Sequence, residues 1–329
     1  MPRTVLKPEP GQRGLLSDRI AKALFATLAL ASVVAFSKPV LAETTTYNVA
    51  KVKGLDIFYR EAGPKTAPTV LLLHGFPSSS HMFRELIPAL SAKYHVIAPD
   101  YPGFGHSSAP SPDAFTYDFT NLAEVVDEFT TIVGLKSYVI YMQDYGGPVG
   151  MRLAMKHPER VRGFVVQNAV ANVEGWSQQA AANLKPAWAN RTPETEKALH
   201  DILETTRFQY TEGVARKDRI NPDAWVFDQV LLDRPGNDTI QVELLYQYKD
   251  NVTQYPRWQD YLKTKQPPIL VVWGTGDPIF TPAGRDLFKT LVPSTMVYSF
   301  EAGHFALETH EPEIADAMLT FLASLPERN

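Results

Sequence analysis

Residues 138–150 have the sequence Tyr-Val-Ile-Tyr-Met-Gln-Asp-Tyr-Gly-Gly-Pro-Val-Gly. The opening run of β-branched and aromatic residues predicts a buried strand over Tyr138–Tyr141. Two glycines and a proline follow soon after Asp144, and a helical pattern continues over Met151–Lys156. This order predicts a strand, a sharp turn and a helix, with the Asp144 side chain raised above the end of the strand.

Similar apolar runs recur along the chain and alternate with longer helical patterns, which predicts an α/β fold with a mostly parallel central sheet flanked by helices. Continuous apolar runs of this length favour strands buried on both faces. A Lys53-Gly54 turn between Thr45–Val52 and Leu55–Glu61 predicts an antiparallel edge hairpin. The other expected strands are Thr69–Leu73, His95–Ala98, Phe164–Gln167, Ile269–Trp273 and Met296–Phe300.

The segment between Val170 and about Pro267 has a different character. It is rich in Trp, Tyr, Gln and Asn, and its apolar spacing is helical, as in Glu194–Tyr210 and Thr239–Asn251. We therefore expect the core of the fold in two parts, 43–169 and 268–329, with a helical cap over 170–267. Such an insertion would cover the strand ends, where α/β sheets bind ligands.

The N-terminus has the pattern of an export signal. A basic stretch ends at Lys22, Ala23–Phe36 carries no charge, and Val40 and Ala42 are small residues at the −3 and −1 positions of a cleavage site. We expect residues 1–42 to be a cleaved signal peptide, with no permanent membrane span after processing and a periplasmic or secreted product. An uncleaved N-terminal anchor is the alternative, and without a twin-Arg pair ordinary export is favoured over the Tat route.

The charge balance argues against nucleic-acid partners. The whole chain has a formal net charge of −4. Residues 1–42 hold six of the 32 Lys and Arg but only two of the 36 Asp and Glu, so the remainder is more acidic, with 26 basic and 34 acidic residues. Such a surface repels phosphate backbones. The chain has no cysteine, which excludes disulfides and thiolate chemistry.

Polar segments follow the predicted strands where parallel strands end. His74-Gly75-Phe76-Pro77 follows the first core strand, and Gly274–Pro278 and Ala302–His304 follow the last two. With Asp144 at the earlier turn, the order Asp144, Asp277, His304 is that of nucleophile, acid and base in α/β-hydrolases. Ser107 and Ser108 offer no alternative, because no strand and helix bracket them.

These motifs resemble the epoxide hydrolase and haloalkane dehalogenase branch of the α/β-hydrolase superfamily, over essentially the whole chain from about Tyr47. The Asp at the turn is specific to this branch. The resemblance implies a catalytic triad of Asp144, Asp277 and His304. The motifs that carry it are HGFP (74–77), DYPGFGHS (100–107), QDYGGPVG (143–150), GTGDP (274–278) and AGHFALE (302–308).

An aspartate nucleophile restricts the chemistry. Attack on an ester carbonyl would give an anhydride, whereas attack on a saturated carbon with a leaving group gives a stable alkyl ester. His304 would then activate water to hydrolyse that ester, and Asp277 would orient the imidazole. The resemblance assigns the oxyanion hole to the backbone N–H groups of Phe76 and Tyr145, each donor often contributing about 3 kcal/mol.

The leaving group is the more open question. Dehalogenases of this branch bind halide with N–H groups at the positions of Phe76 and Tyr145, and a Phe side chain has no donor. Epoxide hydrolases use cap tyrosines whose O–H donates to the epoxide oxygen, and Tyr248 is the best candidate, with Tyr210 and Tyr246 as weaker ones. The sequence therefore favours an epoxide hydrolase, with a haloalkane dehalogenase as the alternative. The expected partners are an apolar small molecule and water.

Each residue of the expected triad could instead have a purely structural role. Asp144 or Asp277 could cap a helix, and His304 could be a loop residue. The other position where some dehalogenases carry the acid is Asn168, which supports Asp277 as the acid. Turn-stabilising roles are expected for His74, Asp100 and His106.

The sequence is also compatible with functions of other classes. A non-catalytic ligand-binding protein of the same fold is the alternative from a different class. An esterase or lactonase is disfavoured because the turn lacks a serine. No metal-ligand spacing and no dinucleotide fingerprint occur in the sequence, so no cofactor is expected.

Overall fold

The computed structural model describes Pro2 and residues 44–326. Apart from Pro2, the leader predicted over residues 1–42 lies outside the described residues, and its assignment remains a prediction. Among the described residues, no helix is both long and apolar enough to cross a membrane.

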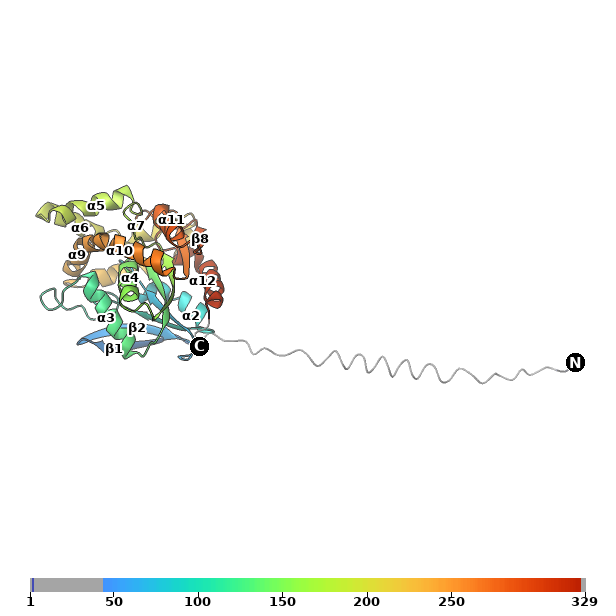
Figure 1. Cartoon of the computed structure of the whole chain (residues 1–329). Coiled ribbons are helices and arrows are strands. Elements are labelled where there is room, and N and C mark those ends of the chain that lie inside the picture. Colours follow the sequence, from blue (N-terminus) through green and yellow to red (C-terminus); the bar gives the residue numbers. More distant parts are fainter. Residues whose placement is uncertain (1, 3–43, 327–329) are drawn as a thin grey trace. The chain divides into compact units, whose positions relative to one another are not determined.

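A central sheet organises residues 44–326 (Figure 1). Its order is β1-β2-β4-β3-β5-β6-β7-β8, with β1 and β2 antiparallel to their neighbours and all other pairs parallel. The predicted mostly parallel sheet is confirmed. The strands are β1 (Thr46–Val52), β2 (Leu55–Ala62), β3 (Thr69–Leu73), β4 (His95–Pro99), β5 (Tyr138–Gln143), β6 (Val161–Gln167), β7 (Ile269–Gly274) and β8 (Met296–Phe300).

The edge hairpin is also confirmed. Lys53 and Gly54 both have positive φ, +48° and +81°, as a two-residue turn between twisted antiparallel strands requires. The expectation of burial on both faces is wrong for one strand. Met296–Phe300 forms β8 at the edge of the sheet, where three of its five side chains are exposed. An edge strand has one neighbour, so its apolar run is only partly covered.

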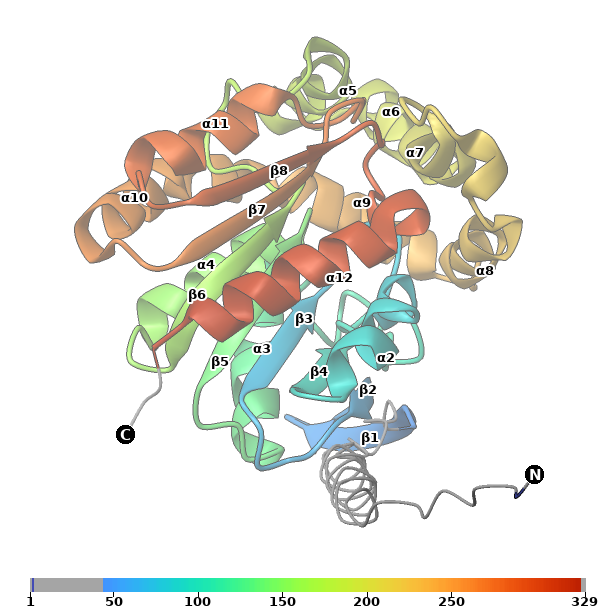
Figure 2. The ribbon, with the colours of Figure 1, turned by 90° about the vertical axis from the view of Figure 1, so that its right-hand side faces the viewer.

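Helices cover both faces of the sheet (Figure 2). On one face lie α2 (Leu86–Ser91) and α12 (Leu307–Ser324); on the other lie α3 (Phe119–Ile132), α4 (Gly146–Lys156) and α11 (Pro282–Leu291). Successive side chains of a strand point to opposite faces of the sheet, so a central strand contributes side chains to two hydrophobic cores, one on each face. In β5, for example, Val139 and Tyr141 belong to the core under α12, whereas Ile140 and Met142 belong to the core under α3 and α4.

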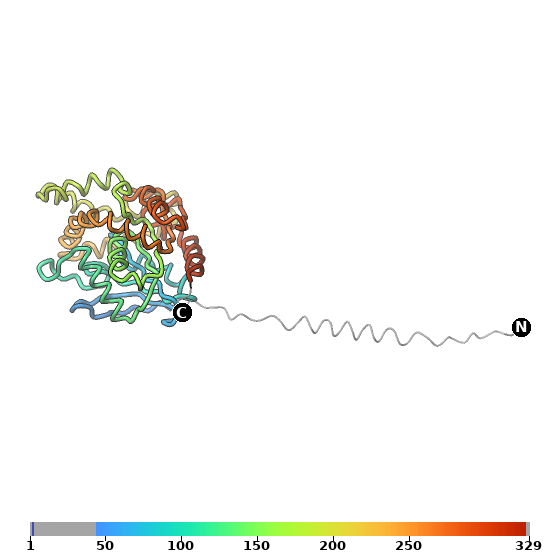
Figure 3. Tube along the Cα trace, in the orientation of Figure 1, coloured from blue at the N-terminus to red at the C-terminus, as the bar shows by residue number. Residues whose placement is uncertain are grey.

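Between β6 and β7, where every residue is described, the main elements are helices. The tube in Figure 3 follows this excursion above the sheet in yellow-green to orange. The predicted helix over Glu194–Tyr210 is divided near Glu204 into two helices. The one predicted over Thr239–Asn251 is also divided, because its first helix ends at Gln247 and the next begins at Lys249. We call these elements the cap helices: α5 (Gln178–Ala189), α6 (Pro193–Leu203), α7 (Thr206–Thr211), α8 (Pro222–Leu232), α9 (Asn237–Gln247) and α10 (Lys249–Lys265).

One turn of the cap segment packs directly against the ends of β7 and β8. Gly213, just after α7, lies against Gly276, and Gly303 lies against Glu212. A Cβ atom on any of these three glycines would overlap a backbone carbonyl of the opposing segment. The backbones therefore approach as closely as they do only because these positions carry no side chain.

Candidate active site

Asp144 lies at the turn between β5 and α4, as the sequence predicts. Its φ is +47°, a left-handed conformation that is unfavourable for a residue with a side chain. Two glycines make the turn feasible: a Cβ on Gly75 would overlap the Asp144 side chain, and one on Gly146 would overlap the carbonyl oxygen of Leu73. The tight packing holds the carboxylate above the end of the sheet, where it is only 6% exposed.

The Asp144 carboxylate accepts two backbone hydrogen bonds. The N–H of Phe76 donates to Oδ1 over 2.8 Å, and the N–H of Tyr145 donates as well. Burial raises the pKa of Asp144 to about 6, against the opposing effect of His304 and of these two N–H groups. The structure thus brings together the predicted nucleophile and both predicted oxyanion-hole donors.

His304 and Asp277 lie next to this carboxylate. Nδ1 of His304 is 2.8 Å from Oδ2 of Asp277, and both side chains are fully buried. Nε2 of His304 points to the other side and lies 3.9 Å from Oδ2 of Asp144. Burial alone would lower the pKa of His304, but the charge and hydrogen bond of Asp277, together with Asp144, raise it.

Asn168 holds the Asp277 carboxylate in place, a role that sequence reasoning did not assign. Its Nδ2 donates to Oδ2 of Asp277 over 2.8 Å and to the carbonyl of Gly274 over 3.0 Å, while the Gly274 N–H donates to its Oδ1 over 2.9 Å. Its φ of +41° puts it in the left-handed region, as at Asp144. The sequence feature that could have indicated this role is the position of Asn168 directly after a predicted strand.

Two buried glutamines hold His304, and the sequence interpretation missed both. Nε2 of Gln143 lies 2.8 Å from Nε2 of the imidazole, and Nε2 of Gln167 donates to the His304 carbonyl over 3.2 Å. Each is the last residue of a strand that is buried on both faces, β5 or β6. No polar–apolar alternation therefore marks the direction of their side chains.

The expected turn residues stabilise the loops below the site. The His74 ring accepts the Tyr101 N–H, and the Asp100 carboxylate accepts the backbone N–H groups of Ser80 and His106. Burial lowers the pKa of His74 to about 4, so the ring is a neutral acceptor. His74 and Asp100 are therefore structural, as predicted.

A cavity of about 330 Å³ opens above Asp144, between the sheet and the cap helices. Its lining is predominantly apolar, and its charged members are Asp144 and Glu212. Such a cavity suits an uncharged, largely apolar ligand. The aromatic residues that line it are Phe76, Tyr145, Trp176, Phe208, Tyr248 and Phe280.

Of the three predicted cap tyrosines, Tyr248 lines this cavity. Its hydroxyl is buried beside that of Tyr255 and interacts with it, while the Tyr255 hydroxyl also accepts the Trp176 indole N–H. Burial raises the pKa of Tyr248 well above its usual range, so the hydroxyl keeps its proton.

Tyr210 and Tyr246 do not line the cavity. Tyr210 donates to Asp228 over 2.5 Å and stacks on Phe305 with ring centroids 4.0 Å apart. The Tyr246 ring lies under Arg191 and Lys249. The structure therefore assigns these two tyrosines to packing and charge contacts.

The indole N–H groups near the cavity already have acceptors in the protein. Nε1 of Trp176 donates to the Tyr255 hydroxyl over 3.0 Å, and Nε1 of Trp188 donates to the Leu245 carbonyl over 2.9 Å.

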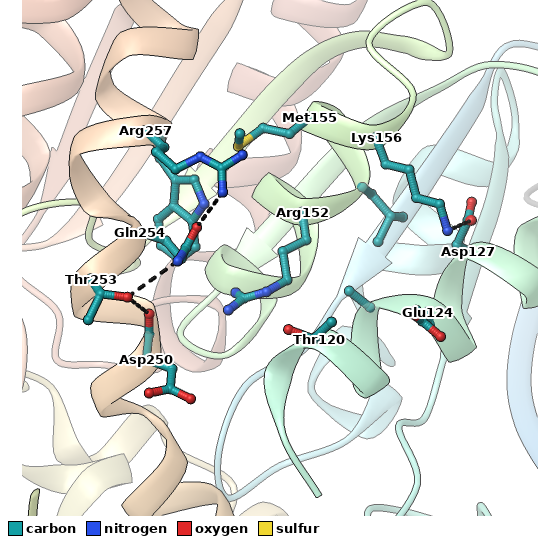
Figure 4. A pocket seen from close by; sticks show the side chains of 13 residues that line it. Thr120, Glu124, Asp127, Arg152, Met155, Lys156, Asp250, Thr253, Gln254 and Arg257 are labelled. Atoms are coloured by element: carbon teal, nitrogen blue, oxygen red, sulfur yellow. Dashed lines mark hydrogen bonds and ion pairs between the residues drawn. The ribbon is translucent and has the colours of Figure 1, made fainter. Parts of the chain in front are cut away.

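A larger hollow of about 620 Å³ lies elsewhere, between α3, α4 and α10 (Figure 4). Its charges are mostly satisfied by neighbours: Lys156 pairs with Asp127 over 2.9 Å, and Arg257 donates to Gln254 over 3.2 Å. Arg152 donates to the Pro148 carbonyl and stacks over Trp258. Within residues 44–326, no cluster of three or more His, Asp or Glu could hold a metal ion.

Comparison with known proteins adds to this geometry. Residues 68–311 match the family described as alpha/beta hydrolase fold. An uncharacterized hydrolase of Saccharomyces cerevisiae is 39% identical over 275 residues, covering 82% of this chain and 94% of that protein. A haloalkane dehalogenase of Mycobacterium marinum is 27% identical, covering 81% of this chain and 89% of that protein.

Solved structures share the fold. The haloalkane dehalogenase DbeA from Bradyrhizobium elkani has a TM-score of 0.73 at 23% identity and covers 85% of this chain and 98% of its own. The epoxide hydrolase CorEH has a TM-score of 0.68 at 19% identity and covers 85% and 99%. The match over most of the chain shows that it belongs to the alpha/beta hydrolase fold family, and haloalkane dehalogenases and an epoxide hydrolase are among the proteins that it resembles.

Proposed function

We propose that this chain is an epoxide hydrolase that forms a covalent ester on Asp144 and hydrolyses it to a vicinal diol. The hydrogen-bond donors around the cavity carry the proposal. The Trp176 indole N–H is already bonded to Tyr255, and the Phe76 side chain has no donor. The Tyr248 hydroxyl lies beside that of Tyr255, and because a hydroxyl hydrogen can rotate, it can be directed at a ligand in the cavity that Tyr248 lines. Such an O–H suits the oxygen of an opening epoxide, whereas a halide needs free N–H groups.

In the first step, Oδ2 of Asp144 attacks one epoxide carbon. The C–O bond to that carbon breaks, and the departing oxygen takes the hydroxyl proton of Tyr248. Oδ1 stays in the oxyanion hole, bonded to the Phe76 N–H. The pKa of Asp144, about 6, leaves most of the carboxylate ionised and nucleophilic at neutral pH.

In the second step, water attacks Cγ of Asp144 and gives a proton to Nε2 of His304. The negative charge then develops on Oδ1, where the Phe76 and Tyr145 N–H groups stabilise it. Asp277 stabilises the imidazolium through its bond to Nδ1. On collapse the Cγ–Oδ2 bond breaks, and the leaving oxygen takes the proton of the added hydroxyl, so that the diol is released and the carboxylate is regenerated. The His304 proton restores the Tyr248 hydroxyl through solvent. The sum is epoxide plus water to diol.

A haloalkane dehalogenase is the second candidate function. The Mycobacterium marinum relative favours it, because that haloalkane dehalogenase aligns over most of both chains. The same Asp144 ester would form, with halide leaving instead of an alkoxide. The two functions differ in the leaving group and share the second step.

The test is single turnover in ¹⁸O water with styrene oxide or 1-bromobutane as substrate. We expect ¹⁸O in the Asp144 peptide and diol from styrene oxide, because water attacks the carboxyl carbon and the original oxygen leaves with the product. The Asp144→Ala variant is the control and should give neither. Diol formation without label in the peptide would exclude the ester mechanism. Bromide release in place of diol would favour the dehalogenase.

We further propose that residues 1–42 direct export and are removed, so that the reaction takes place in the periplasm. The support is the sequence pattern of the leader. Mass spectrometry of the protein from the periplasmic fraction should show a chain that begins at Glu43. A full-length chain in the membrane fraction would favour the uncleaved anchor.

A further inference from the structure

The amide of Gln143 lies against the proposed base, and Gln143 directly precedes the proposed nucleophile in the sequence. Gln143 is fully buried and directly precedes Asp144 in β5. Its Nε2 is 2.8 Å from Nε2 of His304, while its Oε1 is buried and has no partner within the described residues. A Cβ on Gly75 would overlap this Oε1, so the absence of a side chain there leaves room for the amide.

The other ring nitrogen of His304 already has a hydrogen-bond partner. Nδ1 of His304 is bonded to Asp277, so in the neutral ring Nδ1 carries the hydrogen and Nε2 presents a lone pair. A Gln143 N–H can donate to that lone pair until the attacking water takes its place. When Nε2 becomes protonated, the same amide can turn by half a rotation about its last torsion and accept the Nε2 hydrogen with its Oε1. An amide can therefore form a hydrogen bond with both the neutral and the protonated His304 ring.

We propose that Gln143 is a positioning residue for the hydrolysis step: its amide holds Nε2 of His304 toward Asp144 before proton transfer and bonds to the protonated ring after it. This role rests on the proposed function, because it concerns the water-activating step of that mechanism. The first step does not use His304, so loss of the amide should slow ester hydrolysis and spare ester formation.

The surroundings of the ring explain why a neutral partner is suited to this place. Two carboxylates already face His304, Asp277 at Nδ1 and Asp144 beyond Nε2, and the rings of Phe280 and Phe305 pack around it. A third carboxylate here would favour the protonated, inactive base. A neutral amide can bond to the ring without adding charge.

The first experiment compares Gln143→Leu with Gln241→Leu. Gln241 is a matched control, because it is also fully buried with an unpartnered Oε1, but it bonds to the Gly103 carbonyl. With styrene oxide and quenched-flow mass spectrometry, we expect Gln143→Leu to slow ester hydrolysis about tenfold to a hundredfold. Ester formation should change less than about threefold. Gln241→Leu should leave the ratio of the two rates unchanged.

The second experiment needs no turnover and remains informative if Gln143→Leu fails to fold. Imidazole ¹⁵N chemical shifts of His304 are titrated in the wild type and in Gln143→Glu, where the added carboxylate should raise the titration midpoint by about one pH unit or more. An unmoved midpoint would overturn the proposed contact, as would equal slowing of both steps in Gln143→Leu. Absence of any Asp144 ester in the wild type would instead refute the proposed function, and the titration would still test the contact between Gln143 and His304.

Discussion

Nε2 of His304 lies 3.9 Å from Oδ2 of Asp144, which is too far for a hydrogen bond. A serine nucleophile must be bonded to its base, because the base removes its proton as it attacks. A carboxylate is already ionised and needs no such contact. The separation therefore fits a base that acts on water in the second step.

The first prediction concerns His304 itself. The change His304→Gln should leave ester formation largely intact and slow ester hydrolysis by about a thousandfold, a typical contribution of a general base. The variant should then accumulate an adduct of the mass of styrene oxide on the Asp144 peptide, detectable by mass spectrometry. An unmodified Asp144 peptide after incubation would contradict the order of steps.

The second prediction is the pH dependence of ester formation. The pKa of Asp144 is raised to about 6 by burial, and only the carboxylate attacks. The single-turnover rate of ester formation should therefore level off above about pH 6 and fall by about tenfold per pH unit well below it. A rate that stays constant down to pH 4 would contradict the assigned nucleophile.

The third prediction follows from the charges around the base. The carboxylates of Asp277 and Asp144 raise the pKa of His304 in the free protein. Ester formation neutralises Asp144, so one of these two effects disappears and the pKa of His304 should fall. Ester hydrolysis should consequently reach half its maximum at a lower pH than the His304 titration midpoint in the free protein, measured by ¹⁵N NMR. Equal midpoints would mean that Asp144 is not the esterified group.

The fourth prediction separates the two leaving groups. The change Tyr248→Phe removes the proposed proton donor while keeping the ring, and should reduce the rate of ester formation from styrene oxide by about tenfold to a hundredfold. Ester formation from 1-bromobutane should change much less. Tyr246→Phe is the control, since that ring does not line the cavity. Equal losses with both substrates would argue against proton donation by Tyr248.

The fifth prediction concerns stability. Asp228 is buried and accepts the Tyr210 hydroxyl, and burial raises its pKa to about 7. In the unfolded chain its pKa is near 4, so between about pH 4 and 7 the folded state binds more protons, and the free energy of unfolding falls as the pH rises.

The variant Asp228→Asn cannot ionise and keeps an acceptor for Tyr210. Above pH 7 it should exceed the wild type in unfolding free energy by roughly 2 to 4 kcal/mol, with no difference below about pH 4. Urea unfolding at both pH values measures this. The exposed Asp233→Asn in the same region is the control. A variant less stable than the wild type at pH 8 would contradict the prediction.

The sheet was readable from the sequence because continuous apolar runs separated by turn residues mark buried strands. An apolar run does not indicate how many neighbouring strands a strand has. Met296–Phe300 was therefore expected to be buried on both faces, but it forms the partly exposed edge strand β8. Asp144, Asp277 and His304 were predictable as a group, since each lies within a few residues of the end of a parallel strand and such strand ends meet at one edge.

The cap tyrosines and the glutamines could not be placed in the same way. Whether Tyr248 or Tyr210 lines the cavity depends on how each helix is rotated as it packs, which the spacing of apolar residues does not determine. Gln143 and Gln167 end strands buried on both faces, so either direction of the side chain was compatible with the pattern. Long-range packing decided these positions.

The close packing of Gly213 against Gly276, and of Gly303 against Glu212, has a consequence for how this protein can diverge. The turn after α7 packs against the two loops that carry Asp277 and His304. The cap helices therefore cannot be exchanged for those of a relative without affecting these loops. A chimaera that imports the cap of a relative must retain the Glu212–Val214 turn, or the alignment of Asp277 and His304 will be lost. Substrate selectivity should evolve instead through substitutions on α5 and α6, whose side chains line the cavity.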